Sequence, residues 1–160
     1  MSTRADALPA RLAQGAQALA AFAESLSDAE WQTVVTTDAR TVGTLLHHVA
    51  TVYSGEVDLA REVASGKPIT GLTWDMVADL NAQHAQAHAT VSKPETLELL
   101  RQNSRMAADR VRQFTDEELD RAAPVSLNGD APLTAQFLIE DHALRHSFHH
   151  LANIRAALNR

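Results

Sequence analysis

The sequence predicts an all-α fold, a single helical bundle domain that spans residues 1–160. Alanine is abundant, whereas the chain of 160 residues has only 6 glycines and 5 prolines. Alanine is the strongest helix former, and glycine and proline are the weakest. Apolar residues also recur at intervals of three and four, which is the helical period, and we find no strong strand pattern. We therefore expect a four-helix bundle of four main helices, one of them split, with a long loop before the last helix.

The first predicted helix covers residues 4–25. Its apolar stripe is formed by Leu8, Leu12, Ala16 and Leu19. The segment Ser27–Glu30 then has the serine and glutamate of a capping box, directly before Trp31. The following residues, as far as Asp38, are rich in β-branched side chains, so we expect a short turn and an extended connector there.

Three further helices are predicted between residues 41 and 114. The helix at residues 41–65 ends before Gly66 and Pro68, the residue types that typically follow a helix. The helix at residues 73–91 places Trp74 and Leu80 among its inward side chains. Proline is favoured in the first helical turn, so Pro94 opens a helix that runs to residue 114.

The longest loop is expected at residues 122–132. Before it, Thr115–Glu118 repeats the capping signature and starts a short helical turn. The loop contains Pro124, Pro132 and the run Asn128–Asp130, a composition that interrupts regular structure. The last helix is predicted at residues 133–158.

The composition excludes several classes of function. Without cysteine, the chain cannot form a disulfide scaffold, a cysteine-ligated metal site or a thiol nucleophile of its own. The formal net charge of −6 argues against nucleic-acid and anionic-membrane partners, which require a basic face. No apolar run has the length of a membrane span, and the start of the chain lacks the apolar stretch of a secretory signal. We expect a cytoplasmic protein.

The chain has eight histidines, and histidine is both the commonest metal ligand and a frequent acid–base catalyst. The histidines are therefore where we look for function. Four of them lie in the last helix, at His142, His146, His149 and His150. Residues four apart share a helix face, so His142/His146 and His146/His150 are both candidate pairs. His146 and His150 follow the apolar stripe, whereas His142 and His149 lie on another stripe. We therefore expect His146 and His150 to face the interior, where each needs a hydrogen-bond partner or a metal ion.

A third ligand is predicted on the helix at residues 41–65, because a catalytic metal usually has at least three protein ligands. His48 adjoins the apolar stripe of this helix, and His47 lies further around it. We therefore assign His48, with His146 and His150, to a metal site that leaves positions open for water or substrate. The alternative is that these are ordinary core or surface histidines.

His84 and His88 form a further pair four residues apart, in the helix at residues 73–91. They are a competing two-histidine metal site, but no third ligand is obvious nearby in the sequence. The alternatives that we favour are that they line the same pocket as the metal, or that they lie on a partly exposed groove with Asn81. The complete set of candidate pocket-lining residues is Tyr53, Asn81, His84, His88, His142 and His149.

Four segments carry a family resemblance, and those in the second and last helices are the most specific. The segments are Leu26–Trp31, Thr41–Val49, Phe114–Leu119 and Asp141–Ile154. Over nearly its whole length the chain resembles the DinB-like four-helix bundles, which include YfiT-like metal-dependent hydrolases and thiol-dependent S-transferases. The resemblance implies a divalent ion, zinc or nickel above all, on a histidine triad that corresponds to His48, His146 and His150. It also implies a homodimer.

Two kinds of function follow. The first is a metal-dependent enzyme with a small-molecule substrate, either an S-transferase that uses a low-molecular-weight thiol of the bacillithiol or mycothiol type, or a hydrolase. The thiol must be a cosubstrate, because the chain has no cysteine. The second is a non-enzymatic, stress-associated metal-binding or scaffold bundle. A second apolar set on the last helix supports a homodimer, and it consists of Phe137, Leu144, Phe148 and Leu151.

Overall fold

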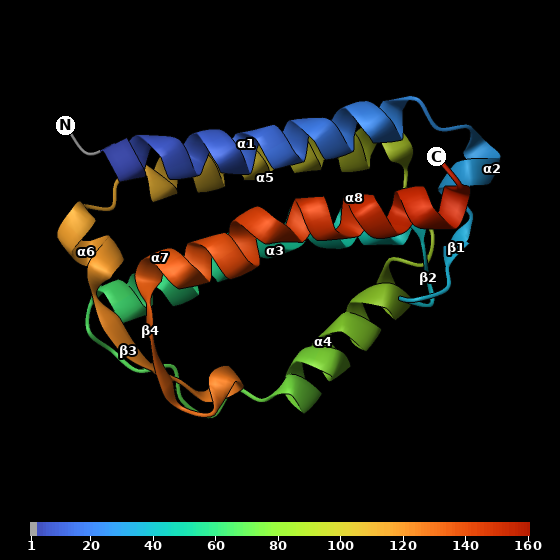
Figure 1. The fold of residues 1–160 in the computed structure, drawn as a ribbon. Coiled ribbons are helices and arrows are strands. Elements are labelled where there is room, and N and C mark those ends of the chain that lie inside the picture. The colour runs from blue at the N-terminus through green and yellow to red at the C-terminus, as the bar shows by residue number, and fades with distance from the viewer. Residues whose placement is uncertain (1–2) are drawn as a thin grey trace.

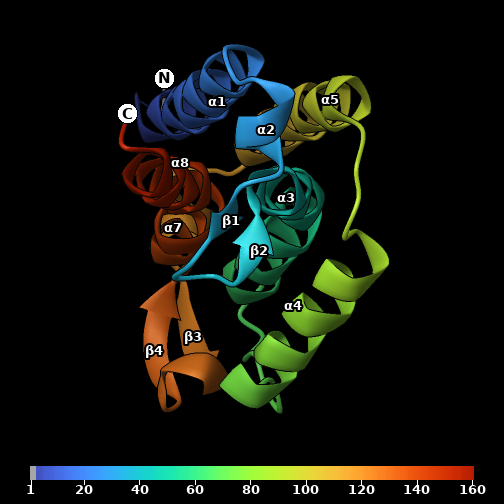
Figure 2. The same cartoon turned by 90° about the vertical axis from the view of Figure 1, so that its right-hand side faces the viewer.

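A computed structural model describes residues 3–160 and shows a bundle of four long helical units. Three of the units are α1 (Thr3–Glu24), α3 (Val42–Ala64) and α5 (Lys93–Val111), and the fourth is the C-terminal unit. α1 packs against α5 and the C-terminal unit, and α3 packs against the same two neighbours. The four units therefore enclose one core, as the two perpendicular views show (Figures 1 and 2). The predicted four-helix bundle is confirmed.

The C-terminal unit is continuous but irregular. It consists of α7 (Ala135–Leu138), a π-helical segment η2 (Ile139–Leu144) and α8 (Arg145–Leu158). It begins two residues later than predicted, because the hydroxyl of Thr134 accepts a hydrogen bond from the backbone N–H of Phe137 at 3.1 Å and caps the helix. A π-helical turn changes the direction of the side chains that follow, and such turns are frequent at functional sites.

Both predicted capping boxes are present. The first opens α2 (Asp28–Trp31) through the side chains of Ser27 and Glu30, and the second opens α6 (Asp116–Asp120). The extended connector after α2 contains two short strands, β1 (Val34–Val35) and β2 (Arg40–Thr41), which pair antiparallel. This small hairpin leads directly into α3.

The segment predicted as a loop is a β-hairpin. β3 (Ala122–Val125) pairs antiparallel with β4 (Ala131–Thr134), and the short helical turn η1 (Ser126–Asn128) connects them. Pro124 and Pro132 face each other in this register. Both strands of a two-stranded ribbon are edge strands, where a missing backbone N–H is tolerated, and the prolines that indicated a loop are compatible with a hairpin for that reason.

The helix predicted at residues 73–91 lies outside the bundle. It is α4 (Trp74–Ala87), and it crosses the open side of α3 beside the β3–β4 hairpin (Figures 1 and 2). None of its residues, all within the described range, is buried. Trp74 and Leu80 are 58% and 59% exposed, so the prediction that they face the core is wrong. Their apolar periodicity reflects a helix that covers a cavity and not one that packs into the core.

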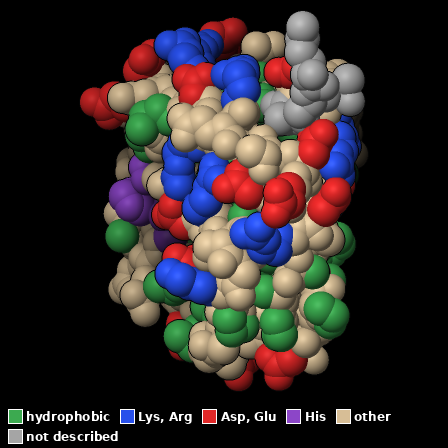
Figure 3. All heavy atoms as spheres, turned by 90° about the vertical axis from the view of Figure 1, so that its left-hand side faces the viewer, with side chains coloured by type: hydrophobic (Ala, Val, Ile, Leu, Met, Phe, Trp, Pro, Cys, Tyr) green, Lys and Arg blue, Asp and Glu red, His purple; other side chains and the backbone are tan. Residues whose placement is uncertain are grey.

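The core lies between the four helical units, and its largest fully buried side chains are leucines, isoleucines, one valine and one tyrosine. Trp31 belongs to this core, since it is only 4% exposed and its indole lies against Gly43. On the face drawn in Figure 3, acidic and basic side chains are interspersed, and histidine side chains reach the surface at one edge. Across residues 3–160, no helix combines the length and apolar character that crossing a membrane requires.

Candidate metal centre

The structure brings together the three histidines that the sequence singled out. His48 comes from α3, and His146 and His150 come from α8. One ring nitrogen of each lies within 4.8 Å of the others, and Nε2 of His48 is 3.0 Å from Nε2 of His146. Zinc–nitrogen bonds of 2.0–2.1 Å in tetrahedral geometry separate two ligand nitrogens by about 3.3 Å. The donor set therefore fits a small divalent ion with modest side-chain adjustment.

Glu56 positions one of these histidines. It follows His48 on α3 by a little over two turns, and its Oε1 accepts a hydrogen bond from Nδ1 of His146 at 2.6 Å. The Glu56 side chain is only 11% exposed. The other ring nitrogen of His146, Nε2, faces His48 and is the atom available to a metal ion. A carboxylate behind an imidazole in this way is the usual support of a metal-binding histidine.

His48 and His150 are buried, which keeps their rings neutral. Burial, reinforced by neighbouring imidazoles, lowers the pKa of His48 to about 2 and that of His150 to about 3. Neutral imidazole is the form that binds a metal ion. Nδ1 of His150 is buried and has no hydrogen-bond partner within the described part of the chain. An unpartnered buried polar atom is costly, so this site is better suited to holding an ion than to simple core packing.

The three histidines open onto a cavity of about 600 Å³. α3 and the C-terminal unit form its floor, and α4 contributes an apolar wall of Trp74, Val77 and Leu80. This volume lies within the range of roughly 300–1,000 Å³ that is typical of small-molecule sites. A bound ion at this place would be accessible to a small molecule from the cavity.

Arg40 is a cavity residue that the sequence reasoning missed. It lies on β2 and pairs with the carboxylate of Asp38 at 2.9 Å, and both residues line the cavity. Its Nη1 is buried without a hydrogen-bond partner among residues 3–160. Its position in the sequence offered one hint: Arg40 directly precedes Thr41, the N-cap of α3, and α3 carries the predicted ligand His48. The short strand itself has no periodicity that would reveal it.

The other predicted pocket residues divide into two groups. Asn81, His142 and His149 line the cavity. Tyr53 does not, because five residues separate it from His48, which is about 140° around the helix at 100° per residue. Its side chain is 1% exposed and lies in the core.

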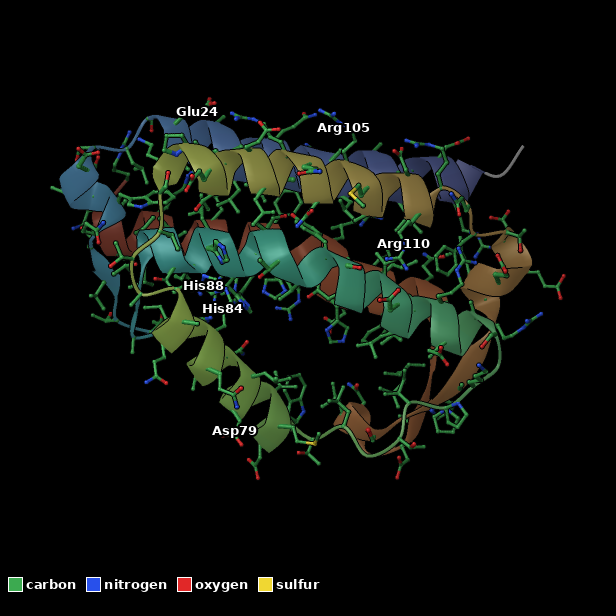
Figure 4. The ribbon with its side chains drawn as sticks, turned by 180° about the vertical axis from the view of Figure 1, so that it is seen from behind. Glu24, Asp79, His84, His88, Arg105 and Arg110 are labelled. Atoms are coloured by element: carbon green, nitrogen blue, oxygen red, sulfur yellow. The ribbon has the colours of Figure 1, made fainter. Side chains whose placement is uncertain are left out.

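His84 and His88 also lie outside this cavity, and they contact His47 instead. In Figure 4 both point from α4 toward α3, whereas Asp79 points away from the bundle. A hydrogen bond of 2.9 Å joins Nδ1 of His47 to Nε2 of His84, and the rings of His47 and His88 stack with centroids 4.0 Å apart. The interpretation of His84 and His88 as pocket-lining residues needs correction: they share a face of α4 with Val77 and Asn81, but they lie further toward the C-terminal end of the helix, where that face meets His47 and not the cavity.

Comparisons with known proteins agree with this architecture. A family model described as the DinB superfamily matches residues 11–154. Among solved structures, YfiT from Bacillus subtilis is similar with a TM-score of 0.75 and 18% sequence identity, over 100% of this chain and 89% of that one. That protein is described as a probable metal-dependent hydrolase with an unusual four-helix bundle topology. A search of curated proteins finds no match.

Proposed function

This chain belongs to the DinB superfamily, and we propose that it is a metal-dependent enzyme that acts on a small molecule. The observation that carries this proposal is that His48, His146 and His150 all line one cavity. Three protein ligands leave at least one coordination position free, which is typical of catalytic and not of structural zinc sites. An ion in this position would be accessible to a substrate that occupies the cavity.

The donor set selects the class of ion. Imidazole nitrogens suit zinc and nickel, whereas magnesium and calcium prefer oxygen ligands. Such an ion, when bound, would act as a Lewis acid and lower the pKa of a water or thiol at its free coordination position. We propose zinc or nickel as the resident ion.

The residues of this chain have distinct roles around that position. Glu56 holds the proton of His146 on Nδ1 and fixes the orientation of the ring. Arg40 lines the cavity as a guanidinium paired with Asp38, and it is the cationic side chain that we propose to contact an anionic group of the substrate. The apolar side chains of α4 line the opposite side of the cavity and offer a surface for an apolar part of the substrate. Together these features favour a small substrate with one anionic end and one apolar end.

Between the two enzymatic alternatives, we propose the S-transferase, with a low-molecular-weight thiol of the bacillithiol or mycothiol type as cosubstrate. Within the described residues, the carboxylate that contacts the histidine set is Glu56, which is already bonded to His146. Asp38 and Asp141 also line the cavity, but each is paired with an arginine, Asp38 with Arg40 and Asp141 with Arg145. With these carboxylates already engaged, the site favours a nucleophile that ionises easily. A free thiol has a pKa of about 8.5, far below the 15.7 of bulk water. The hydrolase remains the second candidate.

The test compares the two reactions with the zinc-loaded protein. One assay supplies a low-molecular-weight thiol and an electrophile, and the other supplies a panel of esters and amides. We expect turnover in the first assay, and its loss in His48→Ala but not in Asp58→Asn, since Asp58 pairs with Arg110 on the outer face of α3. Turnover in the second assay alone would identify a hydrolase. Turnover in neither would contradict an enzymatic role and favour the metal-binding scaffold.

We further propose that the chain forms a homodimer through the C-terminal unit. Of the apolar set that suggested this interface, Leu144 and Leu151 are buried within the chain, at 8% and 5% exposure. Phe137 and Phe148 remain 38% and 40% exposed. α1 covers one side of Phe148, because Gly15 has no side chain and lets α1 approach this phenylalanine closely. The proposal therefore rests on the two phenylalanines.

A further inference from the structure

A second group of three histidines lies beside the first. His47 on α3 and His84 and His88 on α4 each place one ring nitrogen within 4.8 Å of the others. All three side chains are half-buried, and the function proposed above uses none of them. His48 of the first group is in ring contact with His84 of the second, with centroids 5.5 Å apart. Six of the eight histidines thus form two adjacent sets of three.

We propose that His47, His84 and His88 bind a second divalent transition-metal ion, which fixes α4 against α3. In this set, His47 is the third ligand that was not apparent from the sequence around the His84/His88 pair. The missing third ligand comes from 37 residues earlier in the chain, on a different helix.

The spacing of the three rings is compatible with a shared metal ion. Nδ1 of His47 is 2.9 Å from Nε2 of His84, and the ring centroids of His84 and His88 are 4.7 Å apart. Nitrogens on a tetrahedral zinc ion would be separated by about 3.3 Å, so small side-chain rotations accommodate the ion. Because the group contains three imidazoles, it is suited to zinc, nickel, cobalt or copper and unsuited to magnesium or calcium.

The second set has its own access from solvent. His47 and His88 line a cavity of about 420 Å³ that is separate from the cavity of the first set. Thr90, Ser92 and Glu95 line the same cavity and give it a polar wall. An ion can therefore enter this site without passing the first one, and water can complete its coordination.

The position of α4 explains what this ion would do. α4 has no buried residue along its described length, so apolar packing holds it weakly. A few hydrogen bonds hold its two ends: the hydroxyl of Thr44 donates to the carbonyl of His88, and the indole of Trp74 donates to the carbonyl of Leu127, each at 2.9 Å. The backbone of Leu72, just before α4, is also hydrogen-bonded to the hydroxyl of Ser126. An ion shared by α3 and α4 adds a strong link between them. Since α4 forms the apolar wall of the substrate cavity, occupancy of the second site controls how closely that wall approaches the first.

Metal stoichiometry tests the proposal directly. Full-length protein is stripped with a chelator, dialysed against increasing Zn²⁺ and analysed for bound zinc per chain. We expect two zinc ions in the wild-type protein and one in the double variant His84→Ala/His88→Ala. His47→Gln, which leaves α4 unchanged, should show the same loss. The matched control is His142→Ala/His149→Ala, which removes two histidines outside both sets and should still bind two ions. Saturation of the wild-type protein at one ion, or two ions in the α4 double variant, would overturn the proposal.

Hydrogen exchange supplies a readout that is independent of activity. Backbone amides of α4 should exchange more slowly when the second zinc ion binds, and this slowing should be absent in His84→Ala/His88→Ala. Unchanged exchange of α4 in the wild-type protein on binding of the second ion would overturn the role assigned to it.

Failure of this proposal is distinguishable from failure of the proposed function. His146→Ala/His150→Ala removes two ligands of the first set and leaves the second set intact. This variant should retain one zinc ion together with the slowed exchange of α4. If it retained both ions, the first site would be wrong. If it retained none, the second would not exist as an independent site.

Discussion

Replacing Glu56 by glutamine isolates the contribution of the carboxylate behind His146. Glutamine keeps the size and one oxygen acceptor, so the hydrogen bond from Nδ1 of His146 persists without the charge of the carboxylate. Loss of such a supporting carboxylate typically lowers metal affinity by about 10- to 100-fold. We expect zinc affinity at the first site to fall within that range.

The same loss is expected in thermal stability. Zinc at 100 times its dissociation constant stabilises the folded chain by about 2.7 kcal/mol. A 10- to 100-fold weaker affinity removes about 1.3 to 2.3 kcal/mol of this stabilisation at the same zinc concentration. For a domain of this size, the zinc-induced increase in melting temperature should shrink by about 3 to 9 °C. The metal-free protein should be no less stable than wild type, because Oε2 of Glu56 is buried without a partner among residues 3–160.

The assay is a chelator competition for zinc together with thermal melts of the metal-free and zinc-loaded forms. The measurement is made in the His84→Ala/His88→Ala background, so that the first site alone is observed. Asp58→Asn is the matched control, an exposed carboxylate on the same helix that pairs with Arg110. Unchanged zinc affinity in Glu56→Gln, or an equal loss in Asp58→Asn, would refute the assignment of Glu56 to the metal site.

Four further predictions concern stability and assembly. Burial holds the pKa of His48 and His150 below the ordinary value of about 6.5, so in acid the unfolded chain binds more protons than the folded chain. The free energy of unfolding of the metal-free protein should therefore fall by about 1 to 2 kcal/mol per histidine between pH 7 and 5. Denaturant titrations that give equal stability at both pH values would contradict this. Gly43→Ala should destabilise the protein by about 1 to 3 kcal/mol, because its Cβ would lie 2.5 Å from an indole nitrogen. Gly55→Ala on the same helix meets nothing within 4 Å and should raise the melting temperature. Light scattering should give twice the chain mass for the wild-type protein and the single-chain mass for Phe148→Glu, and a monomeric wild type would rule out the homodimer.

Local signals in the sequence determined most of the helical framework. The capping boxes at Ser27 and Thr115 predicted the starts of α2 and α6, and both are present. These signals act over three or four residues, within a single turn, and do not depend on how helices pack. The same local periodicity placed His146 and His150 on one face of the last helix. The structure brings both rings beside His48, and whether the three hold an ion stays a prediction.

Periodicity could not distinguish the environments that an apolar stripe faces. Trp74 and Leu80 have the spacing of core residues, yet α4 lies over a cavity and leaves them exposed. Likewise, Pro124 and Pro132 indicate a break in regular structure, but their pairing across a hairpin depends on the register between two segments. A single stretch of sequence contains no information about its partner, so only the tertiary structure decided these cases.

The sequence by itself determined the helical fold, the helix starts and the histidine pairs four residues apart, because each depends on neighbours within one or two turns. Only the tertiary structure decided which residues meet between elements. It placed Glu56 against His146, 90 residues away, and His47 against His84, 37 residues away. Such contacts are fixed by the packing of α3 against α4 and α8, and helix packing depends on side chains along the whole length of each helix.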